Sequence, residues 1–186
     1  MPRLLLSCFI TVLLGTATIA EDVKLPGPKI ALPEVEGFTK GKTHVYKEAE
    51  FGYSVSYVAP HIVITLYVYN MNQSEIPDGA KSEKVKDEMK RTVGEIEQSK
   101  KNGTYKSVKE IGAAEIVSLG KGKDVPAALR RQFLVERTEG EKFSDAFVTG
   151  YKDHFIKFRI TYDLEEKAES NKKIATFLEA VGSALK

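Results

Sequence analysis

Three basic residues near the end of the chain, Arg130, Lys157 and Arg159, could together bind an anion. Pairing the strands predicted below puts them on one face of a sheet. One predicted cross-strand row contains Arg130, Val148 and Lys157. The row beside it contains Gln132, Ala146 and Arg159. Small side chains on the middle strand would form the floor of a shallow trough for a carboxylate or phosphate, with Arg159 making a two-pronged contact. The alternative is a solvated face, or long stems under a helix with their charges paired to Glu136 or nearby acids.

The sequence contains three histidines, His44, His61 and His154. None is three or four residues from another, so no helical zinc pair is predicted. No Gly-x-Ser-x-Gly nucleophile elbow occurs, and the acidic pairs fall in predicted turns and caps, which are solvated and do not favour acid catalysis. We therefore predict no catalytic residue, no metal and no cofactor. The alternative is a hydrolase-type enzyme with a site assembled from distant residues, such as His61, His154 and a carboxylate.

Two further patterns bear on ligand binding. Residues 37–43 resemble a phosphate-binding loop, but three residues separate the glycines where four are needed, and a strand follows instead of a helix. Nucleotide binding is therefore not predicted. Four tyrosines, Tyr53, Tyr57, Tyr67 and Tyr69, lie on two predicted strands and could line a ligand groove. The alternative is ordinary packing at the edge of a core.

The segment that must position the basic residues reads as three strands in succession: Leu129–Arg137, Glu141–Tyr151 and His154–Tyr162. Residues 138–140 end in a glycine and predict a three-residue hairpin loop, and residues 152–153 predict a two-residue turn. This register gives the sheet one apolar face and one polar face. The predicted apolar face is Leu129, Phe133, Val135, Phe143, Phe147, Ile156, Phe158, Ile160 and Tyr162.

The remaining strands precede this run or flank the first helix. They are predicted at Thr43–Tyr46, Tyr53–Val58, Ile62–Tyr69, Tyr105–Val108 and Ala114–Leu119. The strand at Ile62–Tyr69 is apolar at nearly every position, which predicts a central strand covered on both faces.

Two helices complete the pattern. The first spans about residues 81–101, with an apolar stripe of Val85, Met89, Val93 and Ile96. The second opens at Asp163, with Glu166 completing a capping box. The prediction is an α+β fold, an antiparallel sheet with two main helices packed on it.

The charge balance excludes one broad class of function. Of 28 basic and 26 acidic residues, only Arg3 lies in the first 20 positions, so residues 21–186 hold 27 basic and 26 acidic residues. A nucleic-acid binder carries a clear basic excess, so we predict no nucleic-acid partner. We expect a monomer.

The N-terminus predicts export. A short basic head precedes an apolar run and small residues at positions 18 and 20, which is typical of a cleaved signal peptide at residues 1–20. Residues 21–42 then form an extended Pro-rich arm, and residues 43–186 one α+β domain. A retained anchor and lipidation at Cys8 are alternatives. Cleavage would remove the single cysteine and leave a disulfide-free periplasmic or extracellular protein with no stable membrane span. Asn72 and Asn102 match the glycosylation acceptor pattern, which matters only in a eukaryotic host.

The closing elements also resemble a known family. Residues 154–162, followed by a helix containing Phe177-Leu178-Glu179-Ala180-Val181, resemble the end of a PsbP/Mog1-like domain. Residues 51–57 are similar to a strand near the start of such domains. The resemblance covers about residues 43–185 and implies an α/β/α sandwich around an antiparallel sheet. Members of that fold mostly act as accessory or binding proteins, so the resemblance implies a non-catalytic module that binds a protein or a small anionic ligand.

Overall fold

The computed structural model describes residues 25–122 and 124–186, and the predicted signal peptide lies outside them. The described elements are β1 (Thr39–Lys40), β2 (His44–Val45), the 3₁₀ helix η1 (Ala49–Phe51), β3 (Tyr53–Ala59), β4 (Ile62–Tyr69), α1 (Glu83–Lys101), β5 (Ser107–Ser118), β6 (Ala127–Arg137), β7 (Gly140–Tyr151), β8 (His154–Asp163) and α2 (Lys167–Ala184).

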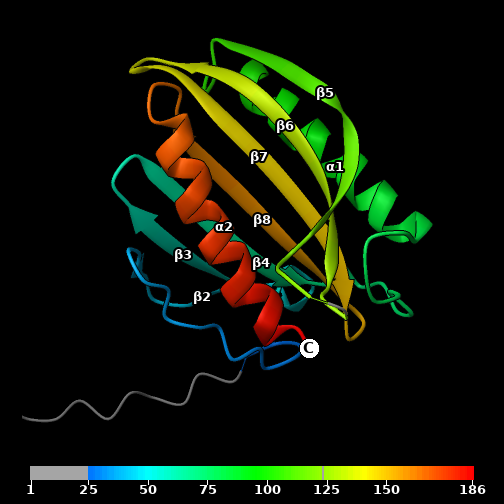
Figure 1. Cartoon of the computed structure of the whole chain (residues 1–186). Coiled ribbons are helices and arrows are strands. Elements are labelled where there is room, and N and C mark those ends of the chain that lie inside the picture. The colour runs from blue at the N-terminus through cyan, green and yellow to red at the C-terminus, as the bar shows by residue number, and fades with distance from the viewer. Residues whose placement is uncertain (1–24, 123) are drawn as a thin grey trace, which may run out of the picture.

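The strands of this part of the chain form one eight-stranded antiparallel sheet (Figure 1). The strand order is β1-β3-β4-β8-β7-β6-β5, and β2 also pairs with β3. The strand after α1 returns to the far edge, so β8 lies between β4 and β7 and joins the two halves of the sheet. Residues of β8 therefore lie near the middle of the sheet, where both halves can supply neighbours.

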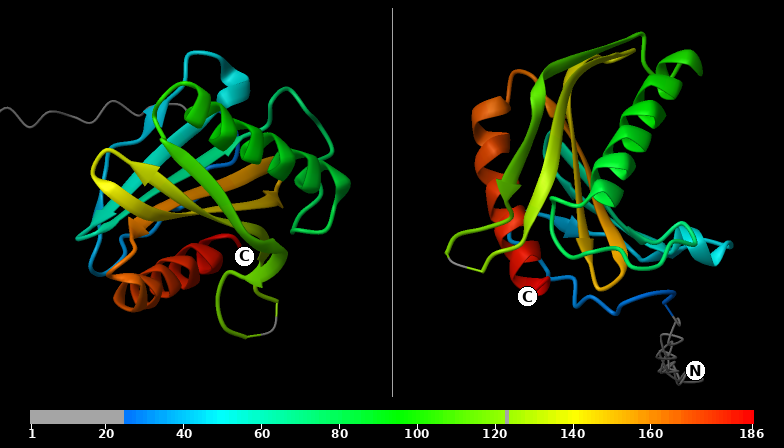
Figure 2. Two further views of the ribbon diagram at one scale, coloured as in Figure 1. Left: turned by 90° about the horizontal axis from the view of Figure 1, so that it is seen from above. Right: turned by 90° about the vertical axis from the view of Figure 1, so that its right-hand side faces the viewer.

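The two helices pack on opposite faces of the sheet (Figure 2). On α2, Ile174, Phe177 and Val181 belong to the larger core, together with the apolar side chains of β3, β4 and β8. On α1, Val85 and Met89 belong to the second core, over β6 and β7. These contacts confirm the predicted α+β fold with two helices on an antiparallel sheet.

Residues 28–35, from the Pro-rich arm, lie against the face that α2 covers. Ile30 and Val35 are buried in the larger core. The phenols of Tyr53 and Tyr57 donate hydrogen bonds to the carbonyls of Pro28 and Pro33, at 3.1 and 3.0 Å. These two tyrosines therefore anchor the arm and face away from the basic residues of β8.

The hairpin between β6 and β7 differs from the prediction by one residue. Arg137 pairs with Gly140, so the loop contains two residues instead of three. A one-residue shift moves every β6 side chain to the other face. Leu129 and Phe133 therefore face α1, and Arg130 faces α2. The predicted row of Arg130 with Val148 and Lys157 is wrong, whereas the predicted pairing of Val148 with Lys157 is confirmed.

Two other predictions need correction. The strands predicted at 105–108 and 114–119 are one bent strand, β5, with a bulge between Ile111 and Glu115 that includes Gly112 at φ 69°. The capping box at Asp163 does not form, because Asp163 is the last residue of β8 and the N-cap is Glu166, whose side chain makes no capping hydrogen bond.

The outer half of the face that carries α1 is open. α1 packs mainly against β5, β6 and β7 and meets β4 at Tyr69, so it leaves β3 and most of β4 uncovered on that side. Val58 and Val63 pair across these strands and are 47% and 49% exposed. The prediction that β4 is covered on both faces therefore holds only at its Tyr69 end and is wrong for the rest of the strand, and the uncovered strip adjoins the basic residues of β8.

Candidate functional site

A groove of about 500 Å³ lies on this open strip, between α1, β4, β8 and the segment from Tyr46 to Phe51. We call it the Arg159 groove. Its aromatic side chains are Tyr46, Phe51, Tyr67 and Tyr69. Its charged side chains are Glu48, Arg91, Glu95, Lys157 and Arg159. Pockets of a few hundred Å³ that combine apolar walls with a few convergent polar groups are typical of small-molecule sites.

The wall formed by Tyr46 and Phe51 depends on Gly52. This glycine has φ 61° and ψ −122°, a conformation that side chains disfavour, and a Cβ there would lie 1.9 Å from the carbonyl oxygen of Val68. The close approach lets the amide of Met71 donate to the carbonyl of Glu50 at 3.0 Å. The wall is therefore held against the end of β4.

Two of the three cations in the groove are neutralised by acids on α1. Arg91 donates to Glu88 through Nε at 2.8 Å and also pairs with Glu95. Lys157 Nζ lies 2.9 Å from Glu95 Oε2. Tyr69 donates its phenol proton to Glu88, which is 3% exposed. In this network Glu88 lies beneath the groove and Glu95 lines it, and the two acids balance the charges of Arg91 and Lys157.

The network perturbs the titration of its buried members. Lys157 is 7% exposed, and this burial lowers its pKa, with Glu95 acting in the opposite direction. Its ammonium also lies 5.1 and 5.2 Å from the ring centres of Tyr67 and Tyr69. Burial raises the pKa of Tyr69 well above its usual value, and the negative charge of Glu88 adds to the effect. Lys157 is therefore a positioned, desolvated cation at the floor of the groove.

Arg159 differs from the other two cations. It lies between Thr65 on β4 and Ala146 on β7, so short side chains flank it on both sides. Its Nη2 donates to Ser144 Oγ at 3.2 Å, and its Nε is buried without a hydrogen-bond partner. Among the described residues, no carboxylate lies within 4.0 Å of its guanidinium. The groove thus contains one arginine with neither a counterion nor a full set of acceptors.

Arg130, the third predicted site residue, lies on the opposite face of the sheet. Its Nη2 is 2.6 Å from Asp145 Oδ2, and its Nη1 is 3.0 Å from Glu115. Asp145 is 2% exposed, and burial raises its pKa while Arg130 counteracts that rise. Arg130 therefore neutralises a buried acid beneath α2 and does not share a site with Lys157 and Arg159. Anion binding by these two residues stays a prediction.

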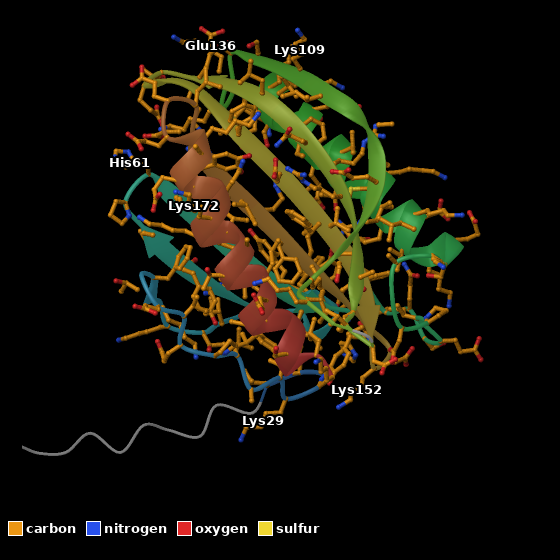
Figure 3. All side chains as sticks on the ribbon, viewed as in Figure 1. Lys29, His61, Lys109, Glu136, Lys152 and Lys172 are labelled. Atoms are coloured by element: carbon orange, nitrogen blue, oxygen red, sulfur yellow. The ribbon has the colours of Figure 1, made fainter. Side chains whose placement is uncertain are left out.

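The histidines do not come together. His61, in the turn between β3 and β4, pairs through Nδ1 with Asp163 at 2.8 Å, and Lys142 also contacts Asp163. His154 begins β8 at the other end of the sheet and contacts the carbonyl of Lys152. Figure 3 shows His61 and Lys152 at opposite ends. The arrangement of His61, His154 and a carboxylate that the enzyme alternative needs is therefore not formed.

Asp163→Asn is expected to destabilise the protein near neutral pH and to have little effect in strong acid. Hydrogen bonds from Lys142 and His61 lower the pKa of Asp163 below 3.8. A carboxyl whose pKa is lower in the folded state contributes stability above its unfolded pKa, and this contribution is lost as the pH falls through the folded value. Urea midpoints of both proteins between about pH 2 and pH 7 test this. A difference that stays constant over this range would contradict it.

Two groove residues, Tyr67 and Tyr69, belong to the tyrosine set considered in the sequence, whereas Tyr53 and Tyr57 lie on the opposite face. No pattern in the sequence indicated that Tyr46 and Phe51 would join them. One signal was present on α1, because Glu88 falls within the apolar stripe beside Val85 and Met89. An acid at such a position must find a partner, and here its partners are groove residues.

No protein-family model matches the chain, and no curated protein matches it. In the described part of the chain, neither helix is long and apolar enough to cross a bilayer. Within the same residues, no three His, Cys, Asp or Glu side chains form a group that could hold a metal ion.

Proposed function

We propose that this protein is an exported, monomeric, non-catalytic binding module. In this proposal the Arg159 groove takes a small anionic ligand that carries an aromatic or other apolar body. The observation that carries the proposal is Arg159 itself, a guanidinium with a buried, unpartnered Nε and no carboxylate nearby. An unpaired cation with unsatisfied donors is costly unless an acceptor completes it, and a carboxylate or phosphate fits its planar fork.

The walls of the groove define the rest of the ligand. Tyr46 and Phe51 stand on one side and Tyr67 lies on the floor, so a flat ring can stack or meet their edges. Lys157 lies in the same groove with its ammonium held in place by Glu95, which balances its charge. The ligand class is therefore an aryl or similarly compact acid.

The fold is compatible with the PsbP/Mog1-like resemblance, whose members mostly act as accessory or binding proteins. This analogy supports a binding role without naming the ligand. The signal-like N-terminus supports export, and the near-neutral charge balance supports a partner other than nucleic acid.

A thermal-shift experiment with benzoate, acetate and inorganic phosphate tests the proposal. Benzoate at ten times its Kd should stabilise the wild-type protein by about 1.4 kcal/mol, a rise in Tm of about 3–6 °C. At equal concentration, acetate should raise the Tm less than benzoate, because acetate lacks the ring. Phosphate should also raise the Tm.

Arg159→Gln should abolish the rise, because glutamine keeps a polar side chain but has no charge and no fork. Arg137→Gln is the matched control. Arg137, on β6, also has a buried Nε without a hydrogen-bond partner, but it lies outside the groove and pairs with Glu139. An equal rise in both variants would show a general salt effect and defeat the proposal.

A further inference from the structure

A second groove lies on the other side of α1, between that helix and the edge of the sheet. Its volume is about 410 Å³, and its apolar lining is Met89 and Val93 from α1, Leu129 from β6 and Ala114 from β5. We call it the β5 groove. It shares no lining residue with the Arg159 groove, because α1 separates the two.

The bulge in β5 accounts for this groove. Glu115 pairs with Arg130 and Ile111 pairs with Gln132, so residues 112–114 leave the ladder while the partner strand continues. A bulge bends its strand, and here the bend follows Gly112 at φ 69°. As a result, Val93 is half-buried and Ala114 is exposed, although both line the groove beside other apolar side chains.

The charged side chains that line the β5 groove have one sign, and each is paired with an acid outside the lining. Lys86, Lys90 and Arg131 line it, and no carboxylate does. The acids that pair with the two lysines, Glu83 and Asp87, lie on α1 outside the lining. Arg131 pairs with Glu110, and its Nε is buried without a hydrogen-bond partner. The groove is thus apolar inside with cations at its rim.

We propose that the β5 groove binds the alkyl chain of a fatty acid, with its carboxylate held by Lys86, Lys90 and Arg131. An unbranched chain fits a lining of aliphatic side chains and methionine, and its burial removes apolar surface from water. The carboxylate matches the cationic rim. This site is independent of the proposed function, which concerns compact acids in the Arg159 groove.

Isothermal titration with octanoate, decanoate and dodecanoate, each below its micelle concentration, tests the proposal. Each added pair of methylenes should tighten binding by about 15-fold until the groove is filled, because a buried methylene contributes about 0.8 kcal/mol. Dodecyltrimethylammonium, with the same chain and the opposite charge, should bind at least about tenfold more weakly than dodecanoate. Equal affinity for the two head groups would overturn the proposal.

Ala114→Trp should block the groove and weaken dodecanoate binding at least about tenfold, since the added ring occupies the space of the chain. Ala113→Trp is the matched control, because Ala113 is also exposed in the bulge but does not line the groove. Arg159→Gln should leave dodecanoate binding unchanged, which separates this result from the proposed function.

Lys86→Gln combined with Lys90→Gln offers a test that leaves the groove open. Both lysines are exposed on α1, so the fold should tolerate the change. The double variant should bind dodecanoate more weakly than the wild-type protein does, and it should bind dodecyltrimethylammonium at least as tightly. Binding of dodecanoate that survives both this change and Ala114→Trp would exclude the β5 groove as the site.

Discussion

Phe158→Ala is expected to lower the free energy of unfolding by about 3–5 kcal/mol. Phe158 is fully buried at the centre of β8, facing α2. Its ring meets the edges of Phe147 and Phe177 at centroid distances of 6.2 and 6.1 Å. Alanine would leave a cavity where the sheet and α2 meet, and the close-packed neighbours could fill it only in part. Urea unfolding of both proteins measures the difference.

Phe51→Ala is the control for this prediction, because it makes the same chemical change at a phenylalanine that is 40% exposed on the groove wall. Its expected cost is below about 1 kcal/mol. Equal losses for the two variants would contradict the assignment of Phe158 to the centre of the core.

Glu88→Ala is expected to cost about 1–3 kcal/mol, the range for leaving a buried donor without its acceptor. Glu88 is almost wholly shielded from water, and it accepts hydrogen bonds from the phenol of Tyr69 and from two nitrogens of Arg91. Without it, a buried hydroxyl loses its acceptor and Arg91 keeps only Glu95. Guanidinium chloride unfolding, followed by circular dichroism, measures the loss.

Glu97→Ala is the matched control on the same helix, because Glu97 is exposed. Its expected effect lies within about 0.5 kcal/mol of zero. If Glu88→Ala proved as mild as this control, the network beneath the groove would not be the stabilising unit described above.

The sequence predicted the second hairpin of the three-strand run and missed the first for a specific reason. Lys152 and Asp153 both adopt positive φ, as a two-residue turn requires, and the strands on either side pair in the predicted register. In the first hairpin, Gly140 suggested a loop position but instead pairs with Arg137 as a strand residue. Glycine permits both, so its presence alone could not decide the register.

That single residue changed the predicted site. Lys157 and Arg159 share a face because they alternate on one strand, which needs no knowledge of the partner strands. Placing Arg130 with them depended on the loop length and failed. The sequence could predict a basic pair, and it could not predict which neighbours from other strands would complete the site.

The walls of the Arg159 groove were beyond sequence patterns for another reason. Tyr46 and Phe51 line the groove because Gly52 permits the turn that follows them. Arg91 and Glu95 line it because α1 packs mainly over β7 and places these two residues beside β8. The position of a helix across a wide sheet depends on long-range packing, and a helical stripe predicts only which side faces inward.

The most direct test of the central claim is an NMR titration that follows the arginine Nε–H signals while benzoate is added. The guanidinium of Arg159 is proposed to bind the ligand, so its Nε–H signal, assigned by its loss in Arg159→Gln, should shift in proportion to occupancy. The Nε–H of Arg91, already bonded to Glu88, should move much less. An Arg159 signal that stays in place at saturating benzoate would contradict the proposed site.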